Sequence, residues 1–106
     1  MSDRSLSAPQ QRLLELVSGL NLPVLAAPMF LVSGPKLVSA CCQAGIIGSF
    51  PAPNARTVEQ LEQWLDEIVA EREAAARRGE ARAPWMLNMI VHSTYDRFDA
   101  ELELVK

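Results

Sequence analysis

Three short apolar runs, each closed by a turn and followed by an amphipathic stretch, constrain the fold of this chain more than any other feature. They cover residues 23–28, 46–50 and 85–91. Short apolar runs of this kind suit strands that are covered on both faces of a parallel sheet. Strands that alternate with helices pair in parallel through right-handed crossovers. The sequence therefore predicts an α/β fold in which three parallel strands alternate with helices after a leading helix.

Local signals give the expected ends of the first two helices. The leading helix spans Pro9 to Leu20, with Ser7 as its N-cap and a proline in its first turn, where the missing N–H costs nothing. The second helix begins at Ser33-Gly34-Pro35. Gly45 ends it, because a glycine readily adopts the left-handed conformation that closes helices.

The third and fourth helices follow the second and third apolar runs. Thr57 caps a long helix whose outer side is charged and whose break is expected near Gly79. We expect Ser93 or Thr94 to cap the last helix. Its expected apolar stripe consists of Tyr95, Phe98, Leu102 and Val105.

Size and composition exclude several classes of protein. At 106 residues the chain forms at most one ordinary domain, and 49% of its residues are hydrophobic, so a packed core is expected. The net charge of −3 and the scattered basic residues argue against nucleic-acid binding. No apolar run is long enough to cross a membrane, and no secretory signal is apparent. The adjacent Cys41 and Cys42 suit reduced thiols in the cytoplasm.

Common catalytic and metal-binding motifs do not occur in this sequence. There is no glycine-rich phosphate loop and no nucleophile elbow. The two cysteines lack metal-ligand spacing, so helix packing explains them better. His92 is the only histidine, and its place after the third run predicts a loop or capping role. We therefore name no catalytic residue and no metal ligand.

Three segments together resemble the nitronate monooxygenase family, also called 2-nitropropane dioxygenase-like. They are residues 22–35, 44–57 and 87–92, in matching order and spacing, and the resemblance covers residues from about 10 to 106. It implies a (β/α)8 TIM barrel that uses FMN and molecular oxygen to oxidise alkyl nitronates to carbonyl compounds and nitrite. On that basis, residues 1–106 are the truncated N-terminal part of a single FMN-binding barrel domain.

The resemblance also implies site residues at the carboxyl ends of the strands. A flavin ring needs a flat apolar wall and a few directed hydrogen bonds to its heteroatoms. Phe30 would lie beside the substrate pocket. The residues implied to hold the cofactor are Ala27, Pro28, Met29, Ser49 and Asn88.

Two requirements of the family are expected beyond Lys106: the histidine base and the loops that hold the FMN phosphate. The last helix shows no stop signal, so the chain looks cut, and on its own it should bind FMN weakly or not at all. An enoyl-thioester reductase-type flavin barrel is an alternative that shares the first motif. A non-catalytic fragment with exposed strand edges that pair with another chain is a second alternative. Oligomeric state stays open.

Overall fold

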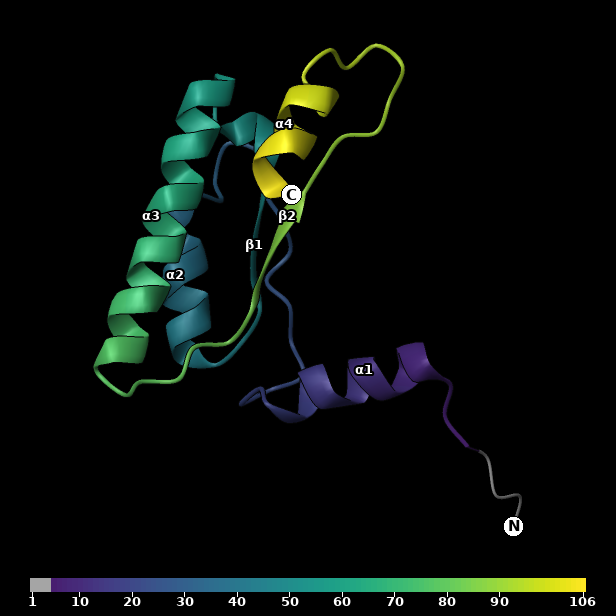
Figure 1. The fold of residues 1–106 in the computed structure, drawn as a ribbon, viewed down its shortest axis with the longest axis vertical. Coiled ribbons are helices and arrows are strands. Elements are labelled where there is room, and N and C mark those ends of the chain that lie inside the picture. Colours follow the sequence, from purple (N-terminus) through teal and green to yellow (C-terminus); the bar gives the residue numbers. More distant parts are fainter. Residues whose placement is uncertain (1–4) are drawn as a thin grey trace.

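The computed structural model describes residues 5–106, which form four α-helices, a short 3-10 helix and a small parallel sheet (Figure 1). Strands β1 and β2 pair in parallel, with Gly48 opposite Trp85 and Pro51 opposite Asn88. Helices α2 and α3 cover one face of this sheet, and α4 packs beside α3. The elements in chain order are α1 (Ala8–Ser18), α2 (Pro35–Ala44), β1 (Gly48–Pro51), the 3-10 helix η1 (Ala52–Asn54), α3 (Val58–Arg77), β2 (Trp85–Asn88) and α4 (Phe98–Val105).

The expected fold class is wrong, because two strands form within residues 5–106 instead of three strands alternating with helices. The structure therefore does not show the expected portion of a (β/α)8 barrel. The run 23–28 makes only an isolated parallel bridge, between Leu25 and Ile47. Pro23 and Pro28 are the first and last residues of this run. Neither has an N–H to donate, so the ladder of hydrogen bonds stops on both sides of the bridge.

The two strands that form are shorter than expected. β1 starts at Gly48, two residues after the expected start, and runs on to Pro51. β2 ends at Asn88, three residues before the expected end. Since β1 turns into η1 directly after Pro51, residues 89–91 have no neighbouring strand to pair with. The partner strand thus limits the length of β2.

The predicted N-caps of α1 and α3 and the predicted glycine end of α2 are confirmed. Ser7 and Gln10 form a reciprocal capping box at the start of α1. Thr57 Oγ1 accepts from the backbone N–H of Gln60 across 3.0 Å. Gly45, at φ 88°, closes α2 in the left-handed region. At the start of α2 the N-cap is Gly34 rather than Ser33.

The expected start of the last helix is wrong. Helix α4 begins at Phe98, so Ser93 and Thr94 lie in the preceding loop. Its one buried residue is Glu101, which was not in the expected apolar stripe. The hydroxyl of Tyr95 donates to Glu101 Oε2 at 2.6 Å, and Arg97 Nη2 lies 3.1 Å from the same oxygen. These two polar contacts determine which side of α4 faces the rest of the protein.

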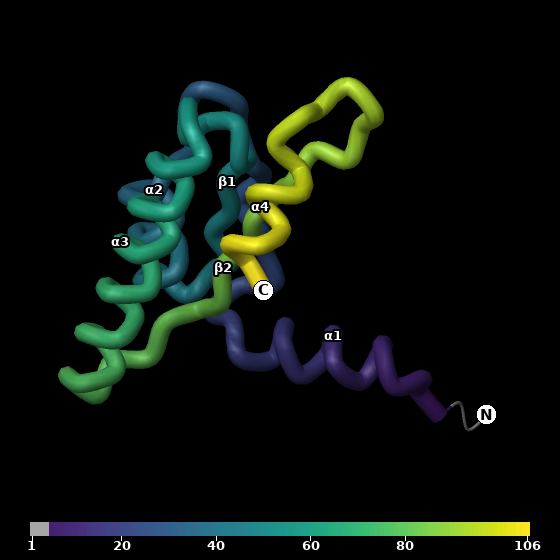
Figure 2. Tube along the Cα trace, turned by 45° about the horizontal axis from the view of Figure 1, so that its top comes forward, coloured from purple at the N-terminus to yellow at the C-terminus, as the bar shows by residue number. Residues whose placement is uncertain are grey.

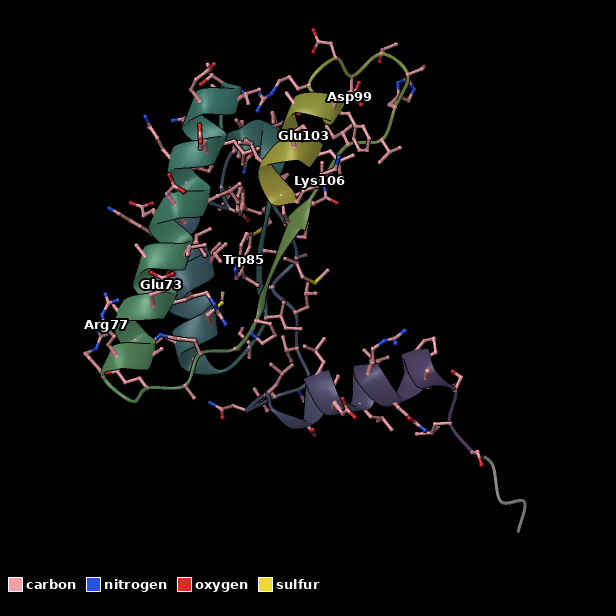
Figure 3. All side chains as sticks on the ribbon, in the orientation of Figure 1. Glu73, Arg77, Trp85, Asp99, Glu103 and Lys106 are labelled. Carbon is pink, nitrogen blue, oxygen red and sulfur yellow. The ribbon has the colours of Figure 1, made fainter. Side chains whose placement is uncertain are left out.

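The hydrophobic core lies between α2, α3 and one face of the sheet. Phe50 is its centre: its ring meets Trp64 edge-on at 5.6 Å and stacks with Trp85 at 6.4 Å. Figure 3 shows Trp85 between α3 and the strands. The buried cluster consists of Val38, Cys42, Phe50, Ala52, Ala55, Leu61, Leu65 and Ile68.

Helix α1 stands apart from this core. It buries none of its residues, and Figures 1 and 2 both show it extending away from α2, α3 and the sheet. Its base is fixed by Asn21, whose N–H donates to Gly45 O and whose Nδ2 donates to Ala44 O, both at 2.8 Å. In the described part of the chain, no helix combines the length and apolar character needed to cross a bilayer.

Candidate functional site

A small hollow lies on the face of the sheet opposite α2 and α3, which we call the open face. Alternation along β2 places Met86 and Asn88 on this face, while Trp85 packs against the core. The hollow has a volume of about 170 Å³. It is lined by Leu25, Pro28, Ser49, Met86, Leu87 and Asn88. Its wall is thus largely apolar, with one hydroxyl and one amide.

Three of the predicted cofactor residues meet at this hollow. Pro28, Ser49 and Asn88 come from three separate segments of the chain, and all three line it. Ser49 is buried, and its hydroxyl donates to the carbonyl oxygen of Ala26. That bond holds the segment before Pro28 beside β1, where the ladder itself makes only one bridge.

The other three predicted residues do not line the hollow. Ala27 is exposed, and Met29 lies in a loop with 44% of its surface accessible. Phe30 is 61% exposed, and the guanidinium of Arg56 lies 5.9 Å from its ring centre. The chain turns away from the sheet at Met29, because the N–H of Met29 donates to Ser33 Oγ at 2.8 Å.

Asn88 is the one directed polar group that the hollow leaves available. Its side chain is exposed and makes no hydrogen bond within residues 5–106. An amide presents both a donor and an acceptor, so it can bind either kind of heteroatom on a planar ring. Ser49 Oγ retains accepting capacity only, since its proton is held by Ala26.

Sequence reasoning missed Asn54, which shapes the rim next to the hollow. This buried residue lies in η1, yet it bonds the loop 29–33: Oδ1 accepts from the N–H of Leu31 at 2.9 Å, and Nδ2 donates to the carbonyls of Met29 and Ser33 at 2.9 and 2.8 Å. Leu31 has a φ of 67°, which is uncommon for a residue with a side chain. The Pro-Ala-Pro-Asn sequence indicates a turn, but it gives no sign of this distant partner.

A second polar cluster joins α4 to the segment after η1. Arg97 Nη1 donates to the carbonyls of Ala55 and Arg56 at 3.0 and 3.3 Å, and its guanidinium also contacts Glu101. Burial, together with the hydrogen bond to Glu101, raises the pKa of Tyr95 to about 12. The phenol therefore holds its proton at neutral pH. The cluster fastens α4 to the segment after η1.

His92 has a local hydrogen-bond partner, and Cys42 is buried. The N–H of Thr94 donates to His92 Nδ1 at 3.2 Å, which agrees with the expected loop or capping role. Cys42 is buried, burial raises the pKa of its thiol, and its Sγ lies 3.5 Å from the carbonyl of Pro84. Helix packing was expected for both cysteines, and the structure buries Cys42 but leaves Cys41 partly exposed. Across residues 5–106, no group of three acidic, histidine or cysteine side chains is arranged to hold a metal ion.

The lining of the hollow has the chemical character that one side of a flavin ring needs. Leu25, Pro28 and Met86 offer an apolar surface to one side of an isoalloxazine ring, and the amide of Asn88 can reach a ring heteroatom. The volume of about 170 Å³ is below the range of roughly 300–1,000 Å³ that encloses a ligand of this size. The hollow alone is therefore too small to enclose a flavin. No protein-family model, curated protein or solved structure matches the chain.

Proposed function

We propose that this chain contributes a flavin-contacting wall to the FMN-dependent oxidation of alkyl nitronates by molecular oxygen. The observation that supports the proposal is the meeting of Pro28, Ser49 and Asn88 at one hollow. These residues are far apart in the sequence, and the resemblance to nitronate monooxygenases implied the same role for all three. The reduced thiols of Cys41 and Cys42 suit a cytoplasmic location for this activity.

Each residue has a distinct role in the proposed site. Pro28 and Met86 pack against one side of the ring and exclude water from it, while Asn88 orients the ring through its free amide. Ser49 keeps the segment that carries Pro28 against β1 through its bond to Ala26. When bound, FMN supplies the electron acceptor for the nitronate, and the products are a carbonyl compound and nitrite. No side chain at the hollow removes a proton, so the substrate is the nitronate anion itself.

The first test measures FMN binding by the full chain. Titration followed by flavin fluorescence should give weak binding, because the hollow contacts only one side of the ring. Asn88→Ala should weaken the affinity about five- to tenfold, the value of one hydrogen bond. Gln63→Ala removes an equally exposed amide from α3 and should leave the affinity unchanged. Equal affinities for the wild type and Asn88→Ala would remove Asn88 from the site.

The second test measures the reaction. A preformed alkyl nitronate is supplied with FMN and oxygen, so that no proton abstraction is needed, and nitrite is quantified. We expect more nitrite with the chain than with free FMN, and a reduced rate for Asn88→Ala. Nitrite release equal to that of free FMN would contradict the proposed activity even if flavin binds.

A further inference from the structure

Helix α1 carries an apolar stripe with nothing packed on it. Leu13 is 59% exposed and Leu16 is 40% exposed, and Val17 lies on the same side of the helix. Helices of about this length are marginal in water unless an apolar side is packed against another element. A capping box at Ser7 stabilises the start of α1, although no residue of this helix is buried against the rest of the chain. We therefore expect the apolar stripe of α1 to pack against another apolar surface.

The part of the open face formed by β2 and Leu25 is the second uncovered apolar surface, since Ser49 and Pro51 of β1 are buried. Leu25 and Met86 are 41% and 48% exposed there, and α2, α3 and α4 all pack on the other side. The four paired residues of each strand extend over roughly 13 Å. An eleven-residue helix extends over roughly 16 Å. The two surfaces thus have similar lengths and the same apolar character.

The overall dimensions show that the chain leaves an interface-sized area uncovered. Its radius of gyration is 15.8 Å, against about 13 Å for a compact chain of this length. It exposes 7301 Å², whereas a compact protein of 11.7 kDa exposes about 5900 Å². Setting aside the most that residues 1–4 can expose, about 700 Å², leaves an excess of about 700 Å². A stable dimer of standard size buries about 800 Å² on each partner.

The helix of the same chain does not cover this face. Two hydrogen bonds from Asn21 hold the base of α1 to Ala44 and Gly45, at the end of α2, and from there the helix extends away from the sheet (Figure 1). We propose that the chain forms a symmetric dimer in which α1 of each copy packs its Leu13 and Leu16 stripe on the open face of the other. A two-fold arrangement covers both surfaces of both copies at once and closes the assembly.

The inference does not rest on flavin binding, and its test is carried out without FMN. The helix of the second copy lies over Met86 and adds a wall to the hollow described above, which alone is too small to enclose a flavin. The contact is made of side chains that are exposed in the single chain. Substitutions there change association without removing core contacts.

The experiment measures the mass of the full chain by light scattering or sedimentation over a range of concentrations. We expect a dimer of twice 11.7 kDa for the wild type. Leu13→Glu in α1 and Met86→Glu on the open face should each weaken dimerisation at least about tenfold, because each places a charge in an apolar contact. Gln11→Glu adds the same charge to the polar side of α1 and should leave the dimer intact.

Mixing the two disrupted variants identifies the contact. The Leu13→Glu chain has an intact open face and the Met86→Glu chain has an intact α1, so a mixture restores one of the two contacts. We expect mixed dimers at concentrations where each variant alone is monomeric. A monomeric wild type overturns the proposal, as does a dimer that tolerates both substitutions, which would indicate pairing through a strand edge. Failure of the mixture to associate also overturns it.

Discussion

The side-chain amide of Asn54 donates to the carbonyl oxygen of Met29 across 2.9 Å and so ties η1 to a loop 25 positions earlier in the chain. The same side chain also bonds Leu31 and Ser33, so one buried residue satisfies three backbone groups of the loop. The loop carries the exposed Phe30 and leads into α2. Its shape depends on a contact that neither segment could make alone.

Asn54→Ala should lower the free energy of unfolding by about 2–4 kcal/mol, because three backbone groups of the loop lose their partner. Denaturant unfolding measures this change. Asn88→Ala is the matched control: its side chain is exposed and makes no hydrogen bond within residues 5–106, so its effect should stay within about 0.5 kcal/mol. Equal stability of the two variants would show that the loop does not need Asn54.

Stability should fall as the pH rises from 10 to 12. Tyr95 has a pKa of about 12 in the folded chain and an ordinary value of 10.0, so the folded state holds the phenol proton more tightly. The contribution of Tyr95 to the free energy of unfolding is fully present below pH 10 and is lost as the pH rises through 12. The raised pKa of the Cys42 thiol acts in the same direction above its ordinary value of 9.0.

Urea unfolding at pH 8 and pH 11 separates the Tyr95 contribution. Tyr95→Phe has no phenol proton to lose and should show a smaller drop between the two pH values than the wild type. It starts from a lower stability at pH 8, since Glu101 loses the hydrogen bond from Tyr95. An equal loss of stability between pH 8 and pH 11 in the wild type and in Tyr95→Phe would show that other groups cause the loss.

Gly48→Ala should destabilise the chain by about 1–3 kcal/mol, the usual cost of overpacking. A Cβ at this position would lie 2.7 Å from the carbonyl oxygen of Val38 and 2.9 Å from its Cα, so β1 and α2 would have to move apart. Gly19→Ala is the control, because the nearest atom to its Cβ is 3.7 Å away. Thermal unfolding compares the two, and a neutral Gly48→Ala would mean that α2 can shift freely against β1.

Phe50→Ala should cost about 3–5 kcal/mol, because the ring is fully buried between two tryptophans. Removing the ring should also change the emission of Trp64 and Trp85, so tryptophan fluorescence reports the local effect directly. Phe30→Ala removes the same ring from an exposed position and should cost less than about 1 kcal/mol. Similar losses of stability for Phe50→Ala and Phe30→Ala would show that Phe50 is not at the centre of the core.

The features that sequence predicts well here are those decided within one turn of the chain. The Ser7 and Thr57 caps and the left-handed Gly45 depend on residues at most four positions away, and all three are confirmed. The number of strands depends on a distant partner. Around Leu25, the nearby prolines limit the pairing with Ile47 to a single bridge. Strand content was therefore overestimated from apolar character alone.

The site shows the same division. Strand-end position grouped Pro28, Ser49 and Asn88, and the structure brings them together at the hollow, although Ser49 lies near the start of β1 and Pro28 lies outside the two strands. It failed for Met29 and Phe30, because Ser33 and Asn54 turn that loop away from the sheet. The start of α4 was missed for a related reason, since Arg97 is held by Ala55 and Arg56 from a segment 40 residues earlier.

The buried cluster around Phe50 draws all its members from Val38 to Ile68, less than a third of the chain. Contacts between residues close in sequence form early, because little loop entropy is lost in bringing them together. During synthesis, the segment from α2 to the middle of α3 can collapse before Trp85 leaves the ribosome. β2 then docks onto a surface that already exists, so the order of translation matches the order of assembly.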